Sequence, residues 1–379
     1  MNRALAAING NGDAQQTLVV VFLRGGADGL TLVAPVEDDR YYHARPRIAV
    51  AKSDAVPLDD MFGLHPLLAP LKPAYTEGHL AILHAAGSED DTHSHFDAQD
   101  FMEHGGSLAA GGWLGRFLRY RQREGEAEGG GPLAAIALGR KFPECLRGAP
   151  SVTVMQSLDD FSLGNGSGPM TAELARLYGA QPDALASAGR DTLQALSRIE
   201  SMRNAVYAPQ NGAQYGTDSF SQGLKQAAQL IKAKVGVEAV SVDLEGWDSH
   251  FAQSTLVEPL MRQLAQGLAA FRLDLGKSID STTTIVMTEF GRRVQENSSF
   301  GTDHGSGGVM FAMGGGIRGG RMLGKWPGIE ADSLTGPGDL AVAYNYRNLI
   351  APVLSRMGAG GQLGQIFPDW DVQQLRVYA

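Results

Sequence analysis

Apolar residues in this chain gather in short continuous runs that are separated by polar loops and amphipathic segments. Such runs, rich in β-branched residues, predict strands that are buried on both faces of a sheet. They lie at 17–23, 80–84, 133–138, 151–155, 237–244, 282–287 and 308–313. Helices are predicted between them, at 64–77, 96–104, 256–275 and 339–357. The alternation predicts an α/β fold with three α/β/α layers and a mostly parallel central sheet.

The same pattern suggests how the chain is divided. Residues 1–16 are small and polar and predict a flexible N-terminal segment, and residues 17–379 predict a single α/β domain. Within that domain, the segment at about 170–235 has apolar residues at helical spacing and few β-branched runs. This pattern predicts a helical insertion over the sheet.

Composition narrows the classes of partner. Lys and Arg total 32 against 41 Asp and Glu, and a net charge of -9 argues against nucleic-acid binding. No apolar run is long enough to cross a bilayer. The lone cysteine, Cys145, excludes an intramolecular disulfide and predicts a buried thiol.

The N-terminal residues contain one arginine, Arg3, and no full hydrophobic core of an export signal. We expect a periplasmic or exported protein if a leader was removed and a cytoplasmic one otherwise. Oligomeric state is left open.

Carboxylates and imidazoles follow several predicted strands, where open parallel sheets bind ligands. Asp28 lies in the glycine-rich loop after the first strand. Asp248 and His250 are two residues apart after the strand at 237–244, so an extended backbone would point both the same way. The alternative is a surface turn in which Asp248 caps the next helix.

A second group of such residues surrounds the strand at 282–287. Glu289 ends that strand, and Asp303 and His304 lie between glycines before the next one. Asp and His pairs favour divalent metals. Arg292 either pairs with Glu289 or holds an oxyanion of a substrate.

The polar loop at 88–97 contains Thr92, Ser94 and His95. Hydroxyls beside imidazoles suit a nucleophile, although Ser94 with Asp97 also fits a helix cap. Dinucleotide and P-loop signatures are absent, so we expect no nucleotide cofactor. The nucleophile-elbow motif is also absent, which argues against an α/β-hydrolase.

Five segments together resemble the bacterial domain-of-unknown-function 1501 family: LVVVFLRGGADGL, SHFDAQDFMEHG, GWLGRFL, TEFGRRVQEN and GTDHGSGGVMFAMGGG. That family is grouped with the alkaline phosphatase-like superfamily, which includes sulfatases and cofactor-independent phosphoglycerate mutases. The resemblance implies an alkaline phosphatase-like fold.

The resemblance also implies site roles. Asp28 would bind one metal with Glu289, and Asp248, His250 and His304 would bind another. Ser94, or else Thr92, would be the nucleophile. Where the superfamily has Asp-His-Gly, this chain has Glu289-Phe290-Gly291, so one His ligand is missing and Asp303 is the candidate to replace it.

The resulting hypothesis is a metal-dependent hydrolase of phosphate or sulfate esters. Its cofactor would be a divalent ion (Zn, Ca, Mg or Mn), and its substrate a small anionic ester or a sulfated or phosphorylated glycan. Arg24 or Arg292 would stabilise the transferring group, and His95 would assist the nucleophile. The alternatives are a non-catalytic metal-containing scaffold that binds a polysaccharide or protein, and a mutase or transferase that uses the same nucleophile.

Overall fold

A nine-stranded sheet forms the centre of the computed structural model, which describes residues 16–107, 110–121, 131, 133–158, 168–179, 184–203, 207–371 and 373–378. The strands span Thr17–Arg24 (β1), Leu80–Gly87 (β5), Ala135–Leu138 (β6), Thr153–Met155 (β7), Ala239–Glu245 (β8), Thr282–Met287 (β9), Gly308–Gly314 (β10), Arg321–Leu323 (β11) and Tyr344–Asn345 (β14). Their order is β11-β5-β10-β9-β1-β8-β6-β7, with β14 on the end of β5. Strand β10 runs antiparallel to β9 and β5, and the other pairings are parallel. The predicted mostly parallel sheet is confirmed.

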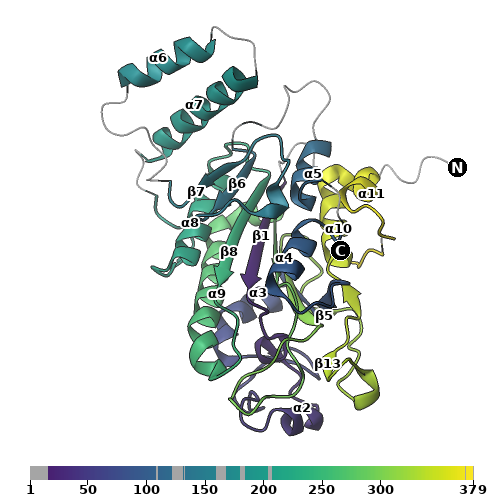
Figure 1. Cartoon of the computed structure of the whole chain (residues 1–379). Coiled ribbons are helices and arrows are strands. Elements are labelled where there is room, and N and C mark those ends of the chain that lie inside the picture. The colour runs from purple at the N-terminus through teal and green to yellow at the C-terminus, as the bar shows by residue number, and fades with distance from the viewer. Residues whose placement is uncertain are drawn as a thin grey trace, which may run out of the picture.

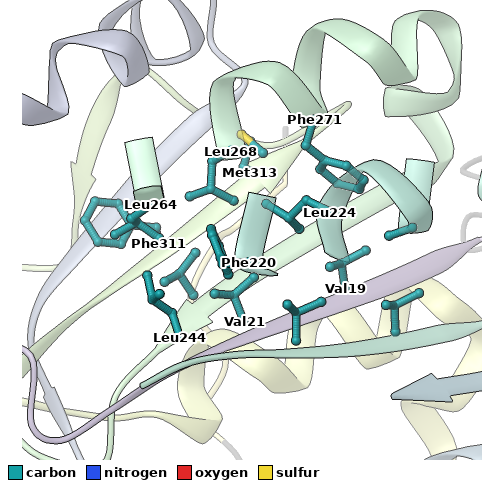
Figure 2. Packing of buried hydrophobic residues seen from close by; sticks show 14 of the residues in the cluster. Val19, Val21, Phe220, Leu224, Leu244, Leu264, Leu268, Phe271, Phe311 and Met313 are labelled. Carbon is teal, nitrogen blue, oxygen red and sulfur yellow. The ribbon is translucent and has the colours of Figure 1, made fainter. Parts of the chain in front are cut away.

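Strand β1 is buried on both faces because helices cover both sides of the sheet. Val19, Val21 and Leu23 point into one core with α8 (Ser219–Lys232) and α9 (Gln253–Leu275), as Figure 2 shows for Val19 and Val21. Leu18, Val20 and Phe22 point into a second core with α5 (Trp113–Tyr120) and α10 (Arg347–Leu354). The two sets alternate along the strand as the pleat requires, and the two helical layers lie on opposite sides of the sheet in Figure 1.

The remaining helices extend these layers. On the second face lie α4 (His95–Glu103) and α11 (Leu363–Ile366), and on the first lie η1 (Pro66–Leu71) and α3 (Lys72–Thr76). Helices α6 (Gly168–Gly179) and α7 (Ala184–Arg203) project beyond the sheet in Figure 1. Short elements complete the fold: α1 (Gly29–Leu32), α2 (Asp39–Ala44), β2 (Val33–Ala34), β3 (Val56–Pro57), β4 (Gly63–Leu64), β12 (Leu334–Thr335) and β13 (Asp339–Leu340).

Three expectations need revision. The predicted helix at 64–77 is split into the 3₁₀ helix η1 and the short α3, because Pro70 and Pro73 each remove a backbone donor. The predicted helix at 339–357 begins only at Arg347, after two short strands. Helix α8, expected in the insertion, belongs instead to the main helical layer.

The predicted flexible segment, 1–16, lies outside the described residues except for Gln16. Among the described helices, none has the length and apolar character needed to cross a membrane.

The topology brings distant loops to one edge of the sheet. Parallel strands β1, β5, β8 and β9 all end at this edge, and the antiparallel β10 begins there. The loops that follow β1, β5, β8 and β9 therefore meet at this edge, and the loop that follows β9 is the one that enters β10. Every one of the site residues predicted from the sequence lies in one of these loops or at its boundary.

Candidate metal centre

Side chains from three loops converge on one oxygen of Asp248. His95 Nε2 lies 3.4 Å from Asp248 Oδ1, His304 Nε2 lies 3.3 Å from it, and His250 Nε2 lies 3.1 Å from it. The ligand atoms of His95, Asp248 and His304 are all within 4.8 Å of one another. His250 Nε2 joins them at 2.9 Å from His304 Nε2. Three imidazoles and a carboxylate thus share one small space.

His304 is oriented by the backbone of the 88–97 loop. Its Nδ1 lies 2.8 Å from the carbonyl oxygen of His93. A carbonyl can only accept, so we assign the proton to Nδ1, which leaves the Nε2 lone pair directed at the cluster. Burial lowers the pKa of His304, which favours the neutral ring that a metal requires. His93 itself has a φ of 53°, an uncommon conformation for a residue other than glycine.

His95 is oriented by Glu289. Its Nδ1 lies 2.8 Å from Glu289 Oε1, and this hydrogen bond raises the pKa of His95. With the proton on Nδ1, Nε2 faces the cluster, and this buried nitrogen has no hydrogen-bond partner within the described residues. An imidazole whose outer nitrogen is held by a carboxylate is the usual arrangement of a metal-ligating His.

Glu289 is a supporting residue rather than a free ligand. It is 1% exposed and accepts hydrogen bonds from Gln99 at 2.7 Å and from the backbone N–H of Gly25 at 2.8 Å. Burial would raise the pKa of this carboxyl, but the bonds from His95 and Gln99 outweigh it and lower the pKa. Glu289 therefore carries a negative charge behind the His95 ring. The expected second metal position at Asp28 and Glu289 has no support in this arrangement.

His250 is held more loosely than the other two rings. Its Nδ1 lies 3.7 Å from Asp303 Oδ1, and 41% of its side chain is exposed. Asp303 also lies 3.5 Å from Arg293. Asp303 is the predicted replacement for the missing histidine ligand. It thus lies behind His250, where it can orient the ring.

Asp248 remains ionised because a buried arginine contacts it. Arg292 Nη2 lies 2.9 Å from Asp248 Oδ1, and the Arg292 side chain is fully buried. Burial of Asp248 opposes ionisation, but the hydrogen bond and charge of Arg292 outweigh it and lower the pKa of Asp248 to about 2. Arg292 is also bonded to the carbonyl oxygens of Gly25, Gly26 and Thr302. It pairs with Asp248, not with Glu289, and its guanidinium is fixed in the wall of the site.

Phe290 forms the apolar side of the centre. Its ring is stacked on His95 with centroids 4.9 Å apart, and it lies 4.8 Å from the ring of His304. The residue that replaces the expected histidine ligand therefore packs the two imidazoles in place. Close backbone packing supports this corner, since a Cβ on Gly291 would lie 1.9 Å from the carbonyl oxygen of Gly307.

Asp28, which was expected to bind metal, lies outside the cluster. Its carboxylate takes two hydrogen bonds from Arg45, at 2.5 and 3.1 Å, and others from Thr31, Gln253 and the backbone of Leu30. Burial alone would raise the pKa of Asp28, but Arg45 outweighs it and lowers the pKa. This pairing gives no support to a ligand role for Asp28, and the sequence did not suggest it because Arg45 is not recognisable from a local motif. Asp28 is also the N-cap of α1.

The two candidate nucleophiles differ in their hydrogen bonds. The Thr92 hydroxyl donates to Asp90 at 2.7 Å and accepts from the backbone of Ser94, so it is fixed in a turn. Ser94 caps α4 through a longer bond of 3.4 Å from the backbone of Asp97, and it directly precedes His95. Both the capping role and the position beside a ligand-type residue therefore apply to Ser94.

Arg24, which was expected to stabilise a transferring group, is already paired. It contacts Asp243 at 2.7 Å, Glu103 at 3.0 Å and Gln99 at 3.0 Å. Burial opposes its charge, but Asp243 and Glu103 outweigh that effect and raise the pKa of Arg24. These contacts make it a connection between strands and α4.

A second set of potential ligands lies at the other end of α4. His104 Nε2 is 3.4 Å from Glu144 and 3.8 Å from Asp100. Glu144, however, is paired with Arg147 through bonds of 2.5 and 2.6 Å. Its carboxylate is satisfied without an ion, so the cluster at Asp248 is the better metal candidate.

The donor set at Asp248 suits a borderline divalent ion. Imidazole nitrogens favour Zn or a similar transition metal, whereas Ca and Mg prefer all-oxygen sites. His95 Nε2, which makes no hydrogen bond to any described residue, is free to bind such an ion, and the Nδ1 atoms of His95 and His304 are already held from behind. The sequence had suggested His95 only as a catalytic residue, and Gln99 and the His93 carbonyl were not recognised. No local signal marks these last two, because they act through contacts with distant segments.

Fold and site together define an α/β protein with a histidine and carboxylate centre at the carboxyl edge of its sheet. The chain belongs to the DUF1501 family, proteins of unknown function, whose family model matches residues 82–360. A comparison with curated proteins finds no match to this chain.

Proposed function

We propose that this protein is a metal-dependent hydrolase of phosphate or sulfate esters, with an alkaline phosphatase-like fold and a single divalent ion at its centre. The observation that carries the proposal is the convergence of His95, His250 and His304 on Asp248, with Nδ1 of His95 held by Glu289 and Nδ1 of His304 held by the His93 carbonyl. A structural ion would not need so exposed a carboxylate, since 46% of the Asp248 side chain is accessible. Zn or Mn fits this donor set better than Ca or Mg.

A bound ion would act as a Lewis acid on the ester oxygen. The protein would supply the rest. Arg292 keeps Asp248 ionised and adds a fixed positive charge beside the anionic ester. Glu289 holds His95 in the tautomer that points Nε2 inward. Phe290 excludes water from one side of the two imidazoles.

Ser94 is the better candidate nucleophile. It lies one residue from His95, and its single long capping bond leaves the hydroxyl freer than that of Thr92. Attack by its Oγ would form a phosphoryl or sulfuryl ester on the serine and release the alcohol, which takes up the proton. Water would then hydrolyse that ester.

The test combines metal analysis with an ester panel of 4-nitrophenyl phosphate, bis(4-nitrophenyl) phosphate and 4-nitrophenyl sulfate. We expect about one Zn or Mn per chain, hydrolysis of at least one ester, and loss of both in Asp248→Ala and His304→Ala. His43→Ala is the matched control, because His43 is an exposed histidine at the end of α2. Ser94→Ala should retain the metal and lose turnover.

The proposal is wrong if metal content and hydrolysis persist in Asp248→Ala and His304→Ala. If the wild-type protein binds one ion and hydrolyses no ester, the non-catalytic scaffold is the correct interpretation instead.

A further inference from the structure

A cavity of about 680 Å³ lies beside the metal centre, between the ends of β6, β7 and β8 and the first turns of α8. Its volume is in the range of roughly 300–1,000 Å³ that is typical of small-molecule sites. Glu245 at the end of β8 lines it, and Asp248 follows three residues later. Three residues separate their Cα atoms by at most about 11 Å. The cavity and the metal centre therefore lie at the same edge of the sheet, close enough for an extended ligand to span the distance between them.

A continuous set of contacts joins the cavity wall to the centre. Asp243 lines the cavity and pairs with Arg24 at 2.7 Å. Arg24 donates to Gln99 at 3.0 Å, Gln99 donates to Glu289 at 2.7 Å, and Glu289 holds His95. The other oxygen of Asp243, Oδ1, is buried and has no hydrogen-bond partner in the described part of the chain.

The charges around the cavity cancel. Arg140 and Lys141 are balanced by Asp243 and Glu245, and Lys141 pairs with Glu245 at 3.2 Å. The four side chains sum to zero, so the lining has no excess of positive charge that would favour a phosphate or a nucleotide over a neutral ligand. The ligand of the cavity is therefore expected to be uncharged.

The other lining residues offer both donors and acceptors. They include three glutamines and three serines, whose amides and hydroxyls can do both: Gln156, Gln222, Gln226, Ser157, Ser219 and Ser241. Ala137, Leu138 and Val242 supply apolar surface between them. Alternating hydroxyls and C–H faces are the chemistry of a sugar ring, which matches such a mixed lining.

We propose that this cavity is a subsite for an uncharged sugar residue of a glycan whose ester group is presented to the metal centre. The inference rests on the proposed function for the role of the ester, but sugar binding in the cavity can be measured without any hydrolysis.

The experiment blocks the cavity and measures binding of unesterified oligosaccharides. Gly139 lines the cavity, has an ordinary φ, and a Cβ there would meet no atom within 4 Å. Gly139→Trp should therefore fill open space. Gly364→Trp is the matched control, because Gly364 in α11 has equally free space and is not among the residues that line the cavity.

Calorimetry of the full chain with cellotetraose, maltotetraose and tetra-N-acetylchitotetraose supplies the measurement, with the peptide Gly-Ser-Gly-Ser as a ligand control. We expect at least one tetrasaccharide to bind, Gly139→Trp to weaken it tenfold or more, and Gly364→Trp to change it less than twofold. Binding should persist after the metal is chelated, so a failure of the hydrolase proposal would leave this result intact.

A second variant guards against misfolding of the first. Gly223 lies in α8 against the cavity, and a Cβ there would meet Val242 at an ordinary 3.5 Å. Gly223→Met should weaken binding as well, while thermal unfolding shows that the chain is folded. The proposal is overturned if no tetrasaccharide binds, if only the peptide binds, or if folded Gly139→Trp and Gly223→Met bind as the wild type does.

Discussion

Replacing Asp28 with Asn tests whether this carboxylate stabilises the fold or binds metal. The change keeps the shape of the side chain but leaves the buried guanidinium of Arg45 without its counter-ion. Arg45 is 0% exposed and the Asp28 side chain is 3% exposed, so water cannot replace the lost charge. Breaking a buried pair typically costs about 3–5 kcal/mol. With an unfolding entropy of roughly 2.1 cal/mol/K per residue, 379 residues give about 0.8 kcal/mol/K, so Tm should fall by about 4–6 °C.

The assay is thermal and urea unfolding of both proteins, combined with metal analysis. Asp38→Asn is the matched control. Asp38 caps α2 and pairs with the exposed Arg40, and Asn is an equally good cap, so it should cost less than about 1 kcal/mol. Metal content should be the same in all three proteins. A loss of metal in Asp28→Asn with unchanged Tm would refute the reasoning and restore Asp28 as a ligand.

Three further predictions concern single residues. Glu289→Gln should weaken metal binding by about 10–100-fold, because it removes the charge that orients His95. Competition with a chelator measures the affinity, and an unchanged affinity would contradict the orienting role of Glu289. His84 is buried and its pKa is lowered to about 4, chiefly by burial. The free energy of unfolding should therefore be independent of this group above about pH 6.5. It should decline by up to about 3 kcal/mol as the pH falls to 4. Urea unfolding at pH 7.5 and 4.5 should show a smaller decline in His84→Gln. Gly291→Ala should prevent correct folding or disrupt the centre, seen as lost metal, because its Cβ would overlap the carbonyl oxygen of Gly307; normal metal content would show that the loop can move.

The hydrophobic pattern was sufficient to predict the central strands and the mostly parallel sheet. The central strands β1, β5, β9 and β10 are buried on both faces, so their composition alone separates them from the loops. Helix boundaries were predicted less well where prolines or short strands interrupt an apolar segment, as at 64–77 and 339–357.

The candidate site was likewise predicted only in part from the sequence. Local sequence was enough to identify Asp248, His250 and His304 as ligand-type residues beside strand ends. The tertiary structure decided that His95 joins them, that Glu289 lies behind His95, and that Asp28 is paired with Arg45. The physical reason is that a side chain's role depends on which groups share its space. Those groups come from loops as far as 267 residues apart that meet only when β1, β5, β8, β9 and β10 form one sheet.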